Sequence, residues 1–205
     1  MEDSKPAPSL RQRQNELTKE LILKALAKVI IEKGVHNFSV QTVANAAGVS
    51  HRTVYRHYPT REALLEGLAA YLDGLFENRP YNPVPEKASE VLEAVTDVFQ
   101  VFEEVDIYVK ALILARLATG HRGKSTLQRD VGFRKIITDL APNLDDGERR
   151  CAAMIIRYLV SSTTWMILTD SLGLTTEEAL QGVKWAIEVL FDDLKKRNRR
   201  AGKKS

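Results

Sequence analysis

The chain has 205 residues, of which 44% are hydrophobic and 28% are charged, and its formal net charge is +3. This length leaves room for one or two domains with a substantial buried core. A single cysteine, Cys151, excludes an internal disulfide and a cysteine-based metal cluster, and is typical of a reducing cytoplasm.

Charge is distributed unevenly along the chain. Residues 1–70 carry 10 Lys and Arg against 7 Asp and Glu, residues 71–194 carry 13 against 20, and residues 195–205 carry 7 against none. Basic segments at both ends of an acidic body indicate a head that meets nucleic acid and a body that does not.

The first 17 residues are polar and include two prolines, so we expect a flexible arm there and no signal peptide. Arg11 and Arg13 are candidates for insertion into a DNA minor groove. A solvated tail explains the same residues equally well. The first predicted helix follows and ends at Gly34, and its apolar stripe consists of Leu21, Ile22, Ala25, Val29 and Ile30.

Two short helical patterns flank a Gly-Val-Ser turn between residues 38 and 59. Ser39 and Ser50 each stand where a side-chain hydroxyl can cap a helix, and Gly48 can take the left-handed conformation that ends the first one. The apolar residues of this first helix are small, which lets the second helix cross it closely. They are Val40, Val43, Ala44 and Ala47.

The second of these helices has an apolar side and a polar side. Val54 and Tyr58 are four residues apart and face inward, and Pro59 ends the helix. The outward side chains are polar, aromatic and basic, which suits base edges and phosphate oxygens of a duplex. Together with neighbouring positions they form the candidate DNA-binding set: Ser39, Gln41, Ser50, His51, Arg52, Thr53, Tyr55, His57 and Arg61.

Different roles are expected within this set. Arg52 is expected to fork onto a guanine and Thr53 to contact a base edge. Tyr55 and His57 are expected to contact phosphates, and so is Arg61 in the first turn of the following helix. The alternative is a packed three-helix corner with a solvated basic face.

Several short motifs between residues 18 and 71 match one family. They are Glu-Lys-Gly at 32–34, Phe-Ser-Val at 38–40, Val-Ala at 43–44, Ala-Gly-Val-Ser at 47–50, Thr-Val-Tyr-Arg-His-Tyr at 53–58 and Arg-Glu-Ala-Leu-Leu at 61–65. In these motifs the segment resembles the N-terminal domain of the TetR family of bacterial transcriptional regulators. Tyr58 stands where the family usually has Phe, and Arg61 where it usually has Lys.

The rest of the chain predicts an all-α fold. Pro80, Pro83 and Pro85 mark a linker, and helical patterns run over about 86–105, 107–119, 126–140, 145–171 and 176–197 without any strand-like alternation. A fourth helix from residue 61 to about 78 connects head and body. The expected boundaries are a flexible arm at 1–17, a helix-turn-helix domain at 18–79, a helical regulatory and dimerisation domain at 80–197 and a basic tail at 198–205. Residues 151–168 are apolar, but Arg157 inside them argues for a buried helix rather than a membrane span.

The last two long helices predict a homodimer. The final helix has one apolar stripe, and Trp185 and Val189 lie on nearly the opposite side, so a second face requires a partner. Small residues in the preceding helix permit close approach, and the resembled family dimerises through such a pair of helices. The predicted interface set is Ala152, Ser162, Leu180, Val183, Ile187, Leu190, Phe191 and Leu194. The alternative for Trp185 is packing on its own domain.

The resemblance also implies a small-molecule effector held inside the body. Six polar, aromatic or soft side chains on otherwise apolar helices are candidates for lining its pocket: Tyr108, Arg116, Arg157, Tyr158, Trp165 and Met166. Ordinary core packing, or a salt bridge for the arginines, is the competing interpretation of each.

No pattern of an enzyme, a metal site or a cofactor site is found in the sequence. Gly120–Ser125 ends like a phosphate-binding loop, but the first glycine is missing and a helical pattern precedes it. We therefore expect a cytoplasmic repressor that binds a palindromic operator in double-stranded DNA and has no membrane partner. The alternatives are an activator, and a DNA-bound architectural protein that recruits a protein partner.

Overall fold

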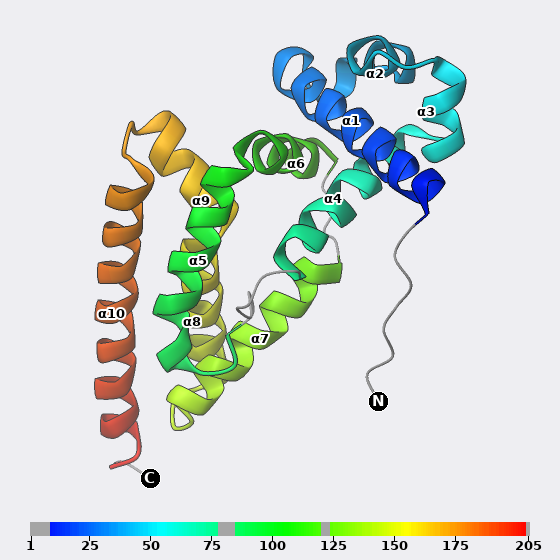
Figure 1. Ribbon diagram of the computed structural model, residues 1–205. Helices are drawn as coiled ribbons and strands as arrows, with labels where there is room; N and C mark the ends of the chain where they lie inside the picture. Colours follow the sequence, from blue (N-terminus) through cyan, green and yellow to red (C-terminus); the bar gives the residue numbers. More distant parts are fainter. Residues whose placement is uncertain (1–8, 78–84, 120–123, 204–205) are drawn as a thin grey trace. The chain divides into compact units, whose positions relative to one another are not determined.

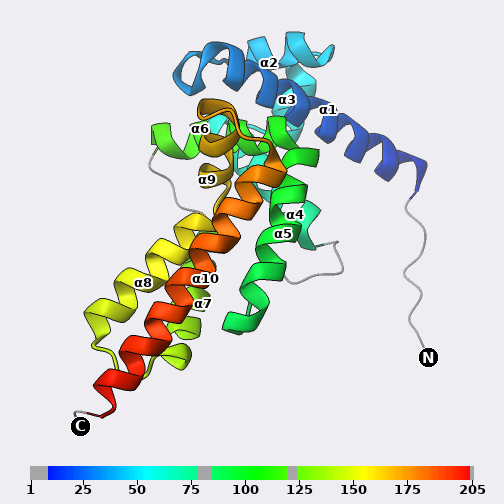
Figure 2. The ribbon, with the colours of Figure 1, turned by 90° about the vertical axis from the view of Figure 1, so that its left-hand side faces the viewer.

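A computed structural model describes residues 9–77, 85–119 and 124–203 (Figures 1 and 2). Within these ranges the chain is helical and has no strand, as predicted. It divides into two compact units. The first comprises Met1–Tyr71 with Lys110–Thr119, and the second comprises Leu72–Val109 with Gly120–Ser205.

The first unit is built around three helices, α1 (Leu10–Lys33), α2 (Val40–Ala47) and α3 (His51–His57), followed by the start of α4 (Arg61–Glu77). It also includes the larger part of α6 (Asp106–Thr119). α2 packs against both α1 and α3. The side chains at the centre of this core are fully buried: Ile22, Leu26, Ile30, Val43, Val54, Leu64 and Leu68.

The start of α1 differs from the expected flexible arm over residues 1–17. The helix begins at Leu10, because the Ser9 hydroxyl accepts a hydrogen bond from the Gln12 backbone N–H and the Gln12 side chain accepts one from the Ser9 N–H. Arg11 and Arg13 therefore stand on exposed helical turns.

The second unit contains α5 (Val91–Glu104), α7 (Lys124–Leu140), α8 (Asp146–Leu159), α9 (Ser162–Met166) and α10 (Thr176–Ala201). α7 pairs with α8, and α10 packs against α5 and α8 (Figure 2). The most deeply buried large side chains of this core come from four of these helices: Phe99, Ile136, Ile137, Ile156 and Ile187.

The helix predicted over 145–171 is broken. α8 ends at Leu159, and α9 begins after Ser161, whose hydroxyl caps the new helix by accepting from the Thr164 N–H. The Thr164 hydroxyl also donates to the Tyr158 carbonyl, and a π-helical turn at 167–171 follows. No single helix among the described residues is long and apolar enough to span a membrane, although α8 together with Ser162–Ser171, bent by 50°, passes that test on length and composition.

Two predictions fall on residues outside the described ranges: Pro80 and Pro83 of the linker, and residues 120–123 of the loop that ends like a phosphate-binding motif. The C-terminal boundary shifts as well. α10 continues to Ala201 rather than ending at 197, because the Asn143 backbone N–H donates to the Asn198 side chain (2.8 Å) and holds this end against the turn between α7 and α8.

Candidate nucleic-acid interface

The turn between α2 and α3 is fixed by three short-range features. The Ser39 hydroxyl accepts from the Thr42 N–H and the Ser50 hydroxyl from the Thr53 N–H, each at 3.1 Å. Gly48 has φ 66° and ψ 27°, the left-handed conformation that costs glycine no steric strain. Both predicted caps and the predicted helix end are confirmed. Because their hydroxyls are engaged in this way, Ser39 and Ser50 act first as caps.

The inward side of α3 anchors it to the unit. Val54 is fully buried and Tyr58 is 9% exposed, as predicted. The Tyr58 ring packs so closely on α4 that a Cβ on Gly67 would overlap the ring. Burial, and then the nearby Glu16 carboxylate, raise the pKa of the Tyr58 phenol above its usual 10.0, so the phenol stays neutral. The inward side of α3 is thus fixed by buried contacts at Val54 and at Tyr58, directly after its end.

The outward side of α3 carries the candidate DNA-reading groups. Arg52, Tyr55 and Arg56 are exposed, and the His51 ring stands edge-on to the Tyr55 ring with centroids 4.5 Å apart. Arg52 and Arg56 are four residues apart and lie on the same side of the helix. Two guanidinium groups on one rigid helix side can fork onto guanine edges or phosphate oxygens.

His57 lies at the end of α3, beside α1. Its pKa is lowered below 6.5, first by burial and then by the positive charges of Arg56 and Lys19, while Glu16 acts in the opposite direction. The imidazole is therefore neutral at pH 7. A neutral ring has one N–H that can donate to a phosphate oxygen.

Arg61 is placed differently from the expectation of a phosphate contact. Its Nη2 donates to the Val35 carbonyl at 2.6 Å, and its guanidinium carbon lies 4.3 Å from the centroid of the buried Phe38 ring. These contacts connect the start of α4 to the segment between α1 and α2. In this structure Arg61 is a clamp inside the unit.

The exposed side of α2 adds two groups. The Gln41 side chain donates to the Asn45 carboxamide at 2.8 Å, and both are exposed. Asn45 and Arg56 were missing from the predicted set. The four-residue spacing of Gln41 from Asn45, and of Arg52 from Arg56, was the sequence signal that would have included them.

The six predicted effector-lining residues differ in exposure and in the compact unit to which they belong. Tyr108 and Trp165 are buried, and the Trp165 indole N–H donates to the Thr176 hydroxyl. Tyr158 is 51% exposed on the surface of the second unit. Arg116 belongs to the first unit, whereas the other five residues belong to the second.

The second arginine of this predicted set has a salt bridge. Arg157 Nε lies 3.0 Å from Asp130 Oδ1, and both side chains are less than one-fifth exposed. This ion pair joins α8 to α7. The salt-bridge interpretation therefore holds for Arg157, and the charge of this arginine does not by itself call for an anionic ligand. Met166, the remaining member of the set, is half-buried in α9.

The predicted dimer stripe is largely internal, which corrects the residue assignment. Five of its members are at most 7% exposed in the single chain: Leu180, Val183, Ile187, Phe191 and Leu194. They pack in the core between α10 and the helices beside it. Ala152, Ser162 and Leu190 are half-buried and remain accessible to a partner.

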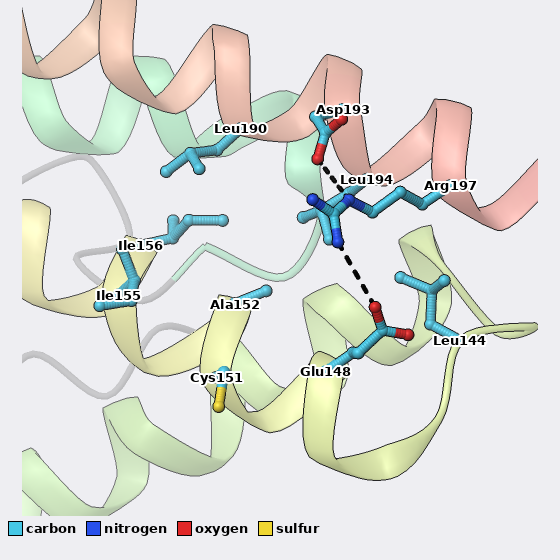
Figure 3. A pocket seen from close by; sticks show the side chains of 10 residues that line it. All are labelled: Leu144, Glu148, Cys151, Ala152, Ile155, Ile156, Leu190, Asp193, Leu194 and Arg197. Atoms are coloured by element: carbon cyan, nitrogen blue, oxygen red, sulfur yellow. Dashed lines mark hydrogen bonds and ion pairs between the residues drawn. The ribbon is translucent and has the colours of Figure 1, made fainter.

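The opposite side of α10 is the open one. Trp185 is 69% exposed and Val189 52%, and Ile155 on α8 is 54% exposed. Between α8 and α10 runs a groove of about 270 Å³, which contains Cys151, Ala152, Ile155 and Leu190 (Figure 3). Arg197 crosses one end of the groove, where it pairs with Asp193 and Glu148. We call Ile155, Trp185 and Val189 with this groove the partner face.

Residues 22–68 match the family model for bacterial regulatory proteins of the tetR family, which covers α2, α3 and the parts of α1 and α4 that pack on them. The chain carries the N-terminal domain of the TetR family. The resemblance seen in the sequence motifs is therefore confirmed, and TetR-family regulators are DNA-binding helix-turn-helix proteins.

Two curated relatives are a transcriptional repressor and a nucleoid occlusion factor. The HTH-type transcriptional repressor KstR2 of Mycobacterium tuberculosis (strain H37Rv) is 24% identical over 155 residues, which cover 71% of this chain and 76% of KstR2. The nucleoid occlusion factor SlmA of Vibrio atlanticus (strain LGP32) is 29% identical over 107 residues, covering 50% of this chain and 52% of SlmA.

A solved structure of a TetR-family transcriptional regulator from Rhodococcus sp. has the same fold. It aligns with a TM-score of 0.64 at 20% identity, covering 85% of this chain and 99% of that one. At this level of identity the match establishes the all-α architecture of the TetR fold for this chain. Among its described residues, no three His, Cys, Asp or Glu side chains gather where they could hold a metal ion.

Proposed function

We propose that this TetR-family regulator is a sequence-specific repressor that binds a palindromic operator as a homodimer. The main support for the proposal is the set of side chains on the outward side of α3. It presents Arg52, Tyr55 and Arg56 on a helix whose start is capped by Ser50 and whose back is buried through Val54. A rigid helix of this kind holds its side chains in one register against base edges.

Homodimerisation follows from the size of α3 and from the partner face. α3 has seven residues, so a single copy contacts few base pairs. A two-fold dimer places two such helices about 34–36 Å apart on successive turns of one side of a duplex. The partner face is apolar and exposed, with Trp185 and Val189 beside the half-buried Ala186 and the open Gly182. Small and aromatic residues together suit close packing of helices from two copies.

Control by a small molecule is the second part of the proposal, and it rests on the family. A ligand that binds the second unit would change operator affinity only by its differential affinity for the DNA-competent and DNA-incompetent states. Such a repressor acts in the cytoplasm, on the chromosome. An activator and a partner-recruiting architectural protein are the alternatives, and a promoter-reporter assay distinguishes repression from activation by the sign of the change.

The experiment that tests DNA reading is selection of bound duplexes from a random library by the wild-type chain. The enriched sequence should be an inverted repeat. Arg52→Ala should then lower affinity for that sequence by about 1–3 kcal/mol and blur one base position in each half-site. Lys28→Ala is the control, because Lys28 is an exposed cation on α1, outside α2 and α3. Failure to enrich any sequence, or equal binding by wild type and Arg52→Ala, would overturn the proposal.

A further inference from the structure

The last turns of α10 present a second concentration of positive charge. Lys196, Arg199 and Arg200 are exposed, and their spacings of three and four residues place them on one side of the helix. The exposed Lys203 follows in the turn directly after the end of α10. No ion pair joins any of the four to another residue in the described ranges. We call these four residues the basic face.

The cations flanking the basic face behave differently. Lys195 pairs with Asp192, and Arg197 pairs with Asp193 and Glu148. The acidic side chains near this end of α10 are thus paired with Lys195 and Arg197. The basic face carries positive charge that these carboxylates leave uncompensated.

This end of α10 is held in place. The Asn143 backbone N–H donates to the Asn198 side-chain oxygen at 2.8 Å, and the Asn143 amide donates to the Asn198 carbonyl at 3.4 Å. Gly202 lies so close that a Cβ there would come within 2.7 Å of the Asn143 amide nitrogen. The basic face is therefore presented on an anchored helix end.

Helix stability alone does not account for the arrangement. Cations in the last turn are favoured by the helix dipole, which explains Arg199 and Arg200. Like charges three and four residues apart on a helix repel each other, however, and Lys196 forms such a pair with Arg199 and another with Arg200. An external anion with closely spaced negative charges would relieve this repulsion.

We propose that the basic face is a second, sequence-independent site that binds the phosphate backbone of nucleic acid. Guanidinium and ammonium groups neutralise the phosphate charges of nucleic acid, and the planar fork of arginine suits phosphate geometry especially well. The exposed apolar residues on the same side of α10, Trp185 and Val189, lie further toward its N-terminus in the partner face. The last turns offer charge without an apolar surface for insertion into a bilayer. This site goes beyond the proposed function, because it does not require α3 to read an operator.

The test uses the full chain and a random-sequence duplex that lacks the selected operator. Binding is measured from about 50 to 200 mM salt for wild type and for K196Q/R199Q/R200Q/K203Q. Loss of four phosphate contacts should make the slope of log K against log salt shallower by up to about 3.6 per chain, so the affinity advantage of wild type should be up to roughly 150-fold larger at 50 mM than at 200 mM salt.

A matched pair of double variants controls for net charge. R199Q/R200Q should reduce the slope by up to about 1.8, whereas R134Q/K135Q, which removes two exposed cations from α7, should leave it unchanged. The double variants also give an answer if the quadruple variant is unstable. Arg52→Ala should keep the wild-type contribution of the basic face, so failure of operator reading and failure of this site are distinguishable.

Three results would overturn the proposal. One is an unchanged salt slope in a folded quadruple variant, and another is an equal decrease in R134Q/K135Q. The third is a quadruple variant with unchanged DNA binding that loses binding to vesicles with anionic lipids, or changes its sedimentation. That result would assign the basic face to a membrane surface or to a second copy of the chain.

Discussion

The α2–α3 corner and the α8–α10 pair differ in how far apart in the sequence their contacting residues lie. In the corner, each helix cap binds a backbone N–H three positions away, as Ser50 does with the Thr53 N–H. Across α8 and α10, contacts such as the Arg197–Glu148 ion pair join residues 49 positions apart. The corner is therefore determined locally, whereas the role of the body surface depends on what packs against it.

The same difference separates the two exposed sets. Arg52, Tyr55 and Arg56 are polar or basic groups that water solvates, so their exposure is stable before any duplex binds. Trp185 and Val189 are apolar groups whose exposure is unfavourable until a second surface covers them. The first set is suited to reversible recognition of DNA, and the second to a lasting contact between protein surfaces.

The largest expected effect comes from charging the partner face. W185E/V189K should convert the dimer to a monomer and lower affinity for the inverted repeat by on the order of a hundredfold or more, because each monomer reads one half-site. Sedimentation equilibrium and DNA titration measure the two effects. L127E/V131K is the matched control, since Leu127 and Val131 on α7 are 50% and 68% exposed and lie outside the partner face. A dimeric W185E/V189K would place the interface elsewhere.

The clamp at Arg61 gives the next effect. Arg61→Ala removes the hydrogen bond to the Val35 carbonyl and the contact with Phe38, and should lower the free energy of unfolding by about 1.5–3 kcal/mol. Urea unfolding measures the loss. Arg56→Ala, on the exposed side of α3, should change stability little. Normal stability of Arg61→Ala combined with a shallower salt slope of DNA binding would restore the phosphate role.

Arg61 also illustrates how far the sequence allowed prediction. Ser39, Gly48, Ser50, Val54 and Tyr58 were predicted correctly, because capping and helical periodicity involve residues close in sequence. The partner of Arg61 lies 26 residues earlier, and nothing in local spacing indicates that contact.

The body was harder to predict for the same reason. Two apolar stripes on α10 compete for the core, and only the packing of α5 and α8 shows that Ile187 is buried while Trp185 is exposed. The break before α9 could have been predicted from the sequence. Ser161 begins a run of four Ser and Thr residues, whose side chains compete with the helix backbone for hydrogen bonds.

Two glycines of α4 differ in the space available for a side chain. Gly67→Ala places a methyl group against the buried Tyr58 ring, and should destabilise the fold by up to about 2 kcal/mol after the gain in helix propensity. Gly74→Ala meets no atom within 4 Å and should stabilise the helix by up to about 1 kcal/mol. Thermal unfolding compares the two, and equal effects would mean that the Tyr58 ring moves aside freely.

The smallest expected effect is on pH dependence. The pKa of His57 is lowered in the folded state, so the unfolded chain binds more protons near pH 6. The contribution of His57 to stability should be complete above about pH 6.5 and decrease as pH falls through its lowered pKa. His57→Gln should remove this part of the pH dependence in urea unfolding, and Arg56→Gln should reduce it by removing a positive charge beside the ring. A pH dependence unchanged in both variants would contradict the assignment.

The central claim is that α3 reads DNA in pairs set by the partner face, and half-site spacing tests it most directly. Affinity is measured for the selected inverted repeat and for the same repeat with about 5 bp inserted at its centre, which turns one half-site to the opposite side of the duplex. If the partner face fixes the distance between the two α3 helices, the insertion should lower affinity at least about tenfold. Equal affinity for the two duplexes would contradict the claim.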